Sequence, residues 1–537
     1  LFICGYINLL CGDHRAARLE IEKSFAFCGD PRVGTNNRLS LIFLHLFELS
    51  LHGNLTAFLR NRDLVLTSFD QTLVRQTVAA PYLSLWSAII MVADGQVATA
   101  YDLLEQGLQV TQTATNAHMV SQYLLWRGFI QALLGNELAA LDDVEKSKRL
   151  RERAGGPFHT ACQMAIGGAT LALLNRHDEA AESLSKAREQ SNHISSMSIT
   201  VCCLAYQALI ALARDNQEDS AEHLCSWLST MNRHGYRCFW GWEPVTMTRL
   251  LRAAVRMGIE PTTAKRLARQ RLGAALDTNG DLIPLLSINM LGTFSLASGD
   301  RILFGPQDLT FHQRELFGLL IANPGQRISQ ELVQLSFWPD SPPNKARKSF
   351  DTLMTRLRKT LSLKLPVPVK NYIGVEKGFV HLSRVSIDAI TFLQFARRGL
   401  RRAKQGQWWQ AGNLFAKALS QWTVLRPIDS FTGDQALAFS DEIVTVLRTI
   451  SLTWSSKLVA LNRPDEAIDI LDMTNKILPV DEDFVLLRYQ LFLKQHQPLK
   501  ARDIVATYHQ ELIQLGWSPE EAEELVISLT SRAIRTL

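Results

Sequence analysis

The chain lacks long hydrophobic runs. Among its 537 residues, no stretch approaches the ~20 consecutive apolar residues that a membrane-spanning helix needs, and no basic-then-apolar leader opens the chain. We therefore expect a cytoplasmic protein with no membrane partner. The chain begins at Leu1, already inside an apolar run, so we expect it to be the C-terminal part of a longer protein.

Cysteine is absent from the second half of the chain. The eight cysteines form no CxxC pair and have no regular spacing, which argues against a disulfide framework or a zinc site. They are Cys4, Cys11, Cys28, Cys162, Cys202, Cys203, Cys225 and Cys238. Free and mostly buried thiols in a reducing compartment fit this pattern.

Motifs that carry catalysis are also missing. The chain contains no GxxxxGK[ST] phosphate-binding loop, no GxSxG and no HExxH. Scattered histidines such as His312 and His381 lack the spaced partners of a metal site. The sequence therefore predicts a protein that is not an enzyme and holds no metal or cofactor of its own.

What is present in the first half is a repeat. A small or polar turn followed by an acidic or Ala-rich helix start recurs at steps of 41, 42, 40, 40, 40 and 43 residues. The markers are Gly12, Gly53, Gly95, Gly135, Asn175, Asp215 and Gly258. Each period holds two helices and two turns, so residues 1–276 are predicted to form a helical-repeat solenoid. The pattern resembles a tetratricopeptide-like array, although the Trp and Tyr signature of the standard repeat is missing.

A solenoid of this kind exposes a concave face suited to an effector or a protein partner. One aromatic cluster within the repeats is a candidate lining for an effector pocket: Tyr236, Phe239, Trp240 and Trp242. Packing at a repeat junction is the favoured interpretation of the same cluster.

A turn-rich stretch at residues 277–281 marks the end of the helical pattern. Residues 286–296 then alternate partly with period two, and a turn at 298–300 predicts a hairpin with a returning strand at 301–304. The formal net charge is +5 for the whole chain, yet residues 341–384 carry ten basic side chains against Asp351 and Glu376 only. This local excess is the expected electrostatic footprint of a nucleic-acid-binding domain.

Three helices are predicted here: residues 309–322, residues 329–335 with Ser329 as N-cap, and a longer helix with Ser341 as N-cap and Pro342 and Pro343 at its first positions. On the third helix a stripe spaced by three and four residues predicts the buried face: Ala346, Phe350, Leu353, Leu357 and Leu361. We expect Trp338 and Phe350 to lie in the core.

The other faces of the third helix carry the side chains expected to contact DNA. They are Asn344, Lys345, Arg347, Lys348, Thr352, Thr355, Arg356, Arg358 and Lys359. A helix with one apolar stripe and six bases can anchor in a core and enter a major groove, with Arg347 and Thr355 as candidates for base contacts. The alternative is a solvated surface helix.

Two strand-like runs, residues 369–375 and 379–383, follow and are joined by Glu376-Lys377-Gly378. Glycine permits the positive φ of a tight hairpin turn. Lys370 and Lys377 are therefore placed on a basic wing that would reach phosphates or the minor groove, unless the lysines serve only to keep a hairpin tip soluble.

The order of these residues resembles the OmpR/PhoB-type winged helix of SARP-type regulators. The run from Leu319-Leu320 through Pro324-Gly325, Ile328-Ser329 and Phe337-Trp338-Pro339-Asp340 carries the resemblance, together with Ala346-Arg347, Arg356-Leu357-Arg358-Lys359 and Gly378-Phe379. The resemblance implies a winged-helix DNA-binding domain of mixed α/β structure at 286–384 and double-stranded DNA as the partner.

Downstream, residues 385–537 resemble the helical, TPR-like bacterial transcriptional activation domain that follows this winged helix in that family. The matching residues include Phe392, Gly406, Trp422, Ala501 and Tyr508; Gln495-His496-Gln497 departs where a Gly-Arg pair is usual. This resemblance implies dimerisation or recruitment of RNA polymerase. The repeats also resemble the sensor region of maltose-activator-like regulators, so any ATP dependence would belong to a missing upstream domain.

The sequence thus predicts a mainly α-helical, sequence-specific transcriptional regulator, an activator by its resemblance, that associates with the nucleoid when bound to DNA. The rival hypothesis is a protein-interaction scaffold in which the winged helix docks protein instead of DNA.

Overall fold

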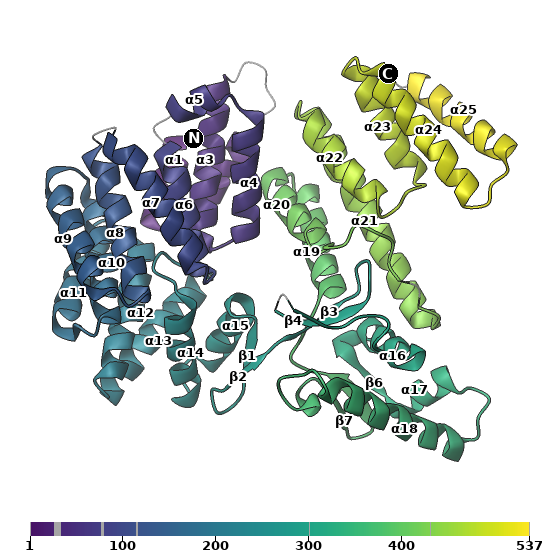
Figure 1. Ribbon diagram of the computed structural model, residues 1–537, viewed down its shortest axis with the longest axis horizontal. Helices are drawn as coiled ribbons and strands as arrows, with labels where there is room; N and C mark the ends of the chain where they lie inside the picture. Colours follow the sequence, from purple (N-terminus) through teal and green to yellow (C-terminus); the bar gives the residue numbers. More distant parts are fainter. Residues whose placement is uncertain are drawn as a thin grey trace. The chain divides into compact units, whose positions relative to one another are not determined.

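The computed structural model describes residues 2–25, 34–76, 80–113, 116–299, 301–429 and 431–535. The chain divides into two compact units, Leu1–Ile283 and Pro284–Leu537. Both are mainly helical, which confirms the predicted fold class (Figure 1). Every helix of the described ranges is too short or too polar to cross a membrane.

The first unit is an array of antiparallel helix pairs. Its helices are α1 (Phe2–Cys11), α2 (His14–Phe25), α3 (Thr35–His52), α4 (Leu55–Ser68), α5 (Gln71–Gln76), α6 (Ala80–Ala93), α7 (Val97–Thr113), α8 (Ala117–Leu133), α9 (Glu137–Arg153), α10 (Pro157–Leu173), α11 (His177–His193), α12 (Met197–Ala213), α13 (Gln217–Arg233), α14 (Pro244–Arg256) and α15 (Pro261–Arg271). A two-stranded sheet of β1 (Ala274–Leu276) and β2 (Leu282–Pro284) follows.

The predicted period has a backbone cause. All seven marker residues adopt a left-handed conformation at the turn between the two helices of a pair, with φ between 54° and 85°. Five are glycines, which reach this region without strain, and Asn175 and Asp215 are among the few other residue types that tolerate it. The solenoid prediction is therefore confirmed at each turn.

The array closes on itself, which the sequence did not predict. The Ser196 hydroxyl donates to the Leu10 carbonyl at 2.6 Å, and the Tyr236 hydroxyl donates to the Gly12 carbonyl at 3.0 Å. Helix α1 accordingly packs against α12. A third contact joins the last helix to the first pairs: the Arg271 guanidinium donates to the carbonyls of Gly53 and Ala93 at 2.6 and 2.8 Å.

The segment that follows α13 fills part of the interior of this closed array. Tyr236, Phe239 and Trp242 are buried, and Trp242 lies under the Arg271 guanidinium. Trp240 is half-buried and packs edge-on against Phe47 and Trp126. The expected concave face is thus partly occupied by the chain's own aromatic side chains.

The second unit begins with a four-stranded sheet in the order β5-β4-β3-β9, in which β3 and β9 run parallel and the other neighbours antiparallel. The strands are β3 (Leu286–Asn289), β4 (Ser295–Ser298), β5 (Arg301–Phe304) and β9 (Val385–Ile387). A three-stranded antiparallel sheet, β6-β8-β7, is formed by β6 (Arg327–Ser329), β7 (Ile373–Glu376) and β8 (Phe379–Leu382).

Three helices pack with these sheets: α16 (Phe311–Ala322), α17 (Gln330–Phe337) and α18 (Pro343–Ser362). Helix α16 starts two residues later than predicted because Thr310 and Gln313 form a capping box. The predicted cap of α17 is confirmed, since the Ser329 hydroxyl accepts from the Leu332 amide at 3.2 Å. Short 3-10 turns lie at Pro324–Gln326 and Val369–Asn371.

Three local predictions were wrong, the third being that Trp338 lies in the core. Ser341 does not cap α18: the N-cap is Pro342, which is held extended because a residue before a proline is disfavoured in the helical region. The strand expected at 369–375 begins only at Ile373, because Asn371 and Tyr372 donate to the carbonyls of Pro368 and Val369 and form a turn. Trp338 is half-buried and stacks on His312, whereas Phe350 lies in the core as expected.

The rest of the second unit is helical. It comprises α19 (Asp388–Lys404), α20 (Trp408–Leu419), α21 (Asp434–Ala460), α22 (Pro464–Asn475), α23 (Glu482–Lys494), α24 (Pro498–Gln514) and α25 (Pro519–Arg535). The apolar residues that carried the resemblance are buried here, among them Phe392, Trp422 and Tyr508. His496 takes a positive φ of 56° in the turn where the family usually has glycine, so the departure leaves the turn intact.

Closure of the first unit gives a stability prediction. Replacing Arg271 by Ala leaves the Gly53 and Ala93 carbonyls without their charged donor, and we expect a loss of about 3 kcal/mol in the free energy of unfolding. Urea unfolding followed by tryptophan fluorescence measures it. The matched control is the exposed Arg269→Ala on the same helix. Equal losses for the two variants would show that Arg271 does not hold the array closed.

Candidate nucleic-acid interface

Helix α18 is anchored by one apolar side. All five residues of the predicted stripe are buried, and Met354 extends it. Full burial of a large apolar side chain contributes about 1.5–3 kcal/mol, so this stripe fixes the rotation of the helix about its axis. The remaining faces of α18 are consequently held outward.

Every side chain predicted to contact DNA is exposed. On α18 these are Asn344, Lys345, Arg347, Lys348, Thr352, Thr355, Arg356, Arg358 and Lys359. The six basic groups among them form no ion pair with any residue in the described ranges, and no acidic residue lies in the first turn of the helix. Unpaired bases on one element produce a strong local positive potential.

The spacing sorts these residues into stripes. Lys348, Thr352, Thr355 and Lys359 follow each other by four, three and four residues, which places them on one line of the helix surface opposite the buried stripe. Arg347 and Arg358 lie on one flank of that line, and Lys345 and Arg356 on the other. Both threonines donate their hydroxyls to backbone carbonyls four residues earlier, so their methyl groups are left for outside contacts.

The wing has the predicted hairpin turn. Lys377 and Gly378 both have positive φ, 48° and 79°, as a two-residue hairpin loop of type I′ requires. The Gly378 carbonyl accepts from the Gln330 amide at 2.9 Å, which ties the wing tip to the start of α17. Lys370 and Lys377 are exposed, and Arg327 lies over the Phe379 ring at 4.0 Å.

Two carboxylates, the buried Glu315 and the half-buried Asp388, join the winged helix to the helical part of the second unit. Glu315 on α16 accepts from the Thr432 and Gly433 amides at the start of α21. Asp388, the first residue of α19, accepts from the Met290 and Leu291 amides at 2.8–3.0 Å. Burial raises the pKa of Asp388 to about 6, against the opposing effect of these amide donors.

An aromatic contact completes this junction. Gly318 on α16 lies so close to Phe431 that a Cβ there would meet the ring at 2.4 Å. Phe431 also packs edge-on against Phe294, which in turn contacts Phe317. Helix α16, which packs against α18, thus belongs to a continuous core that reaches into the helical part of the second unit.

Glu315, Asp388 and Phe431 could not be identified from the sequence as joining residues. Each acts through a contact more than 90 residues away in the chain, which spacing along one helix cannot reveal. The one local clue was that Glu315 is the single acidic residue of α16, where it stands next to an apolar run. The eight lysines and arginines predicted to contact DNA are all exposed on the winged helix.

Comparison with known proteins agrees with a regulator. The chain is 26% identical over 203 residues to the transcriptional regulatory protein MoaR1 of Mycobacterium tuberculosis and 27% identical over 168 residues to its namesake in Mycobacterium bovis. These matches cover 37% and 28% of this chain, and the chain spans 63% and 52% of the lengths of the two relatives. No family model matches the chain. The relatives confirm the expected resemblance to SARP-type regulators, and as regulators they fit a role other than catalysis.

Solved structures match more weakly. Mycobacterium tuberculosis EmbR in complex with a low-affinity phosphopeptide matches at 18% identity and a TM-score of 0.31, covering 47% of this chain and 65% of that one. A Rap protein complexed with competence and sporulation factor matches at 8% identity and a TM-score of 0.37, covering 78% and 94%. Both TM-scores are below 0.5, so neither bears on function.

The junction gives a packing prediction. Gly318→Ala must displace Phe431, and we expect it to lower the free energy of unfolding by about 2 kcal/mol. Gly305→Ala is the matched control, because its Cβ would meet no atom closer than 3.9 Å. Urea unfolding of both variants checks this, and equal stability would mean that the Phe431 contact does not fasten the two parts.

The junction also predicts a pH dependence. An unfolded aspartate has a pKa of about 3.9, whereas burial raises the pKa of Asp388 in the fold to about 6. Between these values the folded chain binds more protons, so the contribution of Asp388 to the free energy of unfolding falls as pH rises from about 4 to about 6. Asp388→Asn, which cannot ionise, should remove about 2 kcal/mol of this fall. Urea unfolding at both ends of the window measures it, with the exposed Asp340→Asn as control; an unchanged slope in Asp388→Asn would contradict the assignment.

Proposed function

We propose that this chain is a sequence-specific, DNA-binding transcriptional regulator in which α18 enters the major groove and the β7–β8 hairpin contacts the neighbouring backbone. The observation that carries the proposal is the set of six unpaired bases on the outward faces of α18, whose rotation is fixed by a buried stripe. The major groove of B-form DNA is wide enough to admit an α-helix with its side chains.

The stripes on α18 suggest that its exposed residues have two different roles in DNA binding. Lys348, Thr352, Thr355 and Lys359 lie farthest from the core and would face the base edges, where a threonine methyl can meet the thymine methyl and a lysine the guanine acceptors. Lys345, Arg347, Arg356 and Arg358 lie on the flanks and would reach phosphates, which position the helix without reading sequence. Arg347, which the sequence suggested as a base contact, is thus proposed to contact a phosphate.

The remaining parts complete the proposal. The helical array of the first unit would sense an effector or a protein partner, and the helical domain of the second unit would support recruitment of RNA polymerase or assembly of a homo-oligomer. Activation, as opposed to repression, rests on the resemblance to SARP-type regulators alone. Under the rival scaffold hypothesis, the unpaired bases of α18 would bind an acidic protein surface in place of DNA.

To test this proposal, the full chain is used to select bound sequences from a pool of random duplex DNA. Its affinity for the enriched duplex is then measured. Lys348→Ala combined with Arg356→Ala should lower the affinity at least a hundredfold and reduce the slope of log affinity against log salt by up to about 2. The parent should lose about a thousandfold between 50 and 200 mM salt if six phosphates are neutralised.

The matched control removes the same charge elsewhere. Arg398 and Arg401 are exposed on α19 and have no ion-pair partner among the described residues, so Arg398→Ala with Arg401→Ala should change DNA affinity less than threefold. No enrichment in the pool, or an equal loss in both double variants, would reject α18 as the recognition element. Loss of a protein partner without loss of DNA affinity would favour the scaffold.

A further inference from the structure

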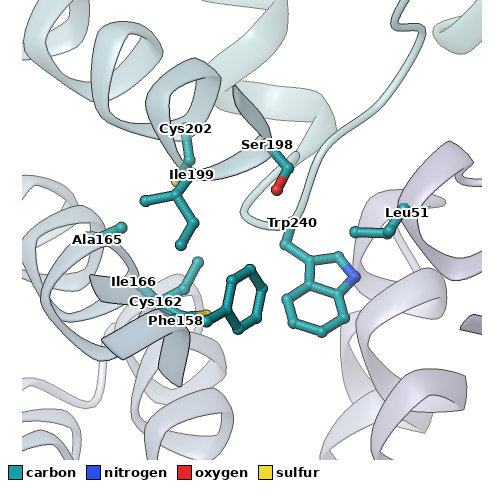
Figure 2. A pocket seen from close by; sticks show the side chains of 9 residues that line it. All are labelled: Leu51, Phe158, Cys162, Ala165, Ile166, Ser198, Ile199, Cys202 and Trp240. Atoms are coloured by element: carbon teal, nitrogen blue, oxygen red, sulfur yellow. The ribbon is translucent and has the colours of Figure 1, made fainter. Parts of the chain in front are cut away.

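The pocket beside Trp240 in the first unit has no room for an effector. It is lined mostly by apolar side chains, among them Phe158, Ile166 and Ile199 (Figure 2). With a volume of about 10 Å³, it holds about one water molecule. The charged surface of the unit is therefore a better candidate for contact with a partner than this pocket.

The positive charge of the first unit is concentrated at its C-terminal end. Residues 233–273 carry nine basic side chains against two acidic ones, whereas residues 1–232 carry eighteen basic against twenty-three acidic ones. Helices α13, α14 and α15 pack on one another at this end (Figure 1). Both acids are bound at helix starts: Glu243 accepts from two amides in the first turn of α14, and Glu260 accepts from the Thr263 hydroxyl at 3.1 Å.

Some of these basic side chains have a role in the fold. Arg252 and Arg256 on α14 both pair with Asp281 in the turn between β1 and β2. Arg271 donates to the carbonyls that close the array. The contacts of these three arginines therefore account for their presence without a partner outside the chain.

Other basic side chains have no acidic partner. Arg233 is exposed, and Lys265 and Arg266 are half-buried; within the described ranges none of the three forms an ion pair. Arg266 Nη2 donates to Asn232 Oδ1 at 3.1 Å, which brings the end of α13 next to α15. Arg269 is exposed one turn after Lys265. Arg233, Lys265, Arg266 and Arg269 together form the α15 patch.

The α15 patch is held outward by the packing of α15. The opposite side of the helix is buried, through Thr263, Ala264, Leu267 and Ala268. With about 3.6 residues per turn, Lys265, Arg266 and Arg269 lie together on the remaining side. The helix macrodipole favours basic residues in the last turn only, so it can account for Arg233 and Arg269 but not for Lys265 or Arg266. A positive surface in the middle of α15 thus has no explanation within the helix itself.

The α15 patch lies close in the chain to the winged helix. Strand β1 follows α15 and packs on it, and a single residue, Leu285, separates β2 from β3. A short connection gives the second of two linked binding surfaces a high effective concentration once the first is bound. Even a weak contact of the α15 patch with DNA would therefore add to the affinity of the whole chain.

We propose that the α15 patch binds backbone phosphates of the duplex that flanks the site bound by α18. The contact would be independent of sequence, because phosphates carry no base information. A cluster of basic side chains on one face is the electrostatic footprint expected for such a polyanion. The proposal rests on the proposed function in taking DNA as the partner, and goes beyond it in giving the first unit a direct contact with DNA.

The experiment compares the affinity of the full chain for the selected duplex with and without a flank of about 20 base pairs of random sequence on each side. Such a flank is about 68 Å long, more than the diameter of about 50 Å expected for a folded unit of this length. The flanks should raise the affinity about tenfold at about 100 mM salt and steepen the slope of log affinity against log salt by about 3. An affinity that does not depend on the flanks would overturn the proposal.

A triple variant tests the named side chains. Arg233→Gln, Lys265→Gln and Arg266→Gln in one chain should abolish the gain from the flanks and leave the affinity for the unflanked duplex as in the parent. Arg233→Lys with Arg266→Lys changes two of the same positions and keeps their charge, so it should keep the gain. Persistence of the gain in the triple variant, or its loss in the charge-preserving variant, would contradict recognition of phosphates by this patch.

The matched control removes one lysine and two arginines elsewhere in the same unit. Lys148→Gln, Arg149→Gln and Arg153→Gln change exposed residues of α9 and should keep the gain from the flanks. An equal loss in this control would assign the effect to the total charge of the unit and overturn the α15 patch. Binding of poly-L-glutamate by a parent that gains nothing from the flanks would assign the patch to an acidic protein surface instead.

Sequence preference and flank dependence separate this inference from the proposed function. Lys348→Ala with Arg356→Ala should lose the preference for the selected duplex and still bind long duplexes more tightly than short ones. If no sequence is selected from the pool, the proposed function fails, and the same comparison of lengths on random duplexes still decides the α15 patch. Selection of a sequence without a gain from the flanks rejects the patch and leaves the regulator.

Discussion

The burial of one stripe of α18 is the constraint on which the second unit depends. Six basic side chains on a single helix repel one another, and no acidic residue in the described ranges pairs with them. The helix keeps this arrangement because Phe350, Leu353, Leu357 and Leu361 are held in a core formed with α16 and α17. Each buried side chain contributes about 1.5–3 kcal/mol, enough together to exceed the repulsion between solvated charges. A surface that favours an anion is thus maintained in the absence of one.

The same core is extended by polar contacts that a winged helix alone would not need. Glu315 accepts from two backbone amides at the start of α21, Asp388 accepts from the amides of the buried Met290 and Leu291, and Gly318 allows Phe431 to lie directly on α16. Unpaired buried amides cost about 1–3 kcal/mol each, so these acids favour one relative placement of the two parts of the second unit. Helices α18 and α21 are therefore linked through side chains packed on α16, a physical route by which a change in one can reach the other.

Much of the fold could be predicted because local patterns in the sequence determine it. The repeat of about forty residues reflects left-handed turn residues such as Gly95 and Asn175, and the face of α18 follows from side chains three and four positions apart. Errors occurred where neighbouring residues compete, as at Ser341, which loses the cap because Pro342 must stay extended before Pro343. Contacts across long separations could not be predicted, because the closure through Tyr236 joins it to Gly12, 224 residues away in the sequence. The exposed DNA-contact candidates were predictable as a set, but their roles were not.

Closure of the array changes how the repeats respond when one of them is stabilised or destabilised. In an open solenoid each repeat contacts only its neighbours, so stability is nearly a sum of local terms. Here Ser196 binds the carbonyl of Leu10, and Arg271 joins the ends of α3 and α6, which couples repeats far apart in sequence. A ligand that binds only the folded array stabilises the folded array by mass action, and the closing contacts spread that stabilisation over repeats that never touch the ligand.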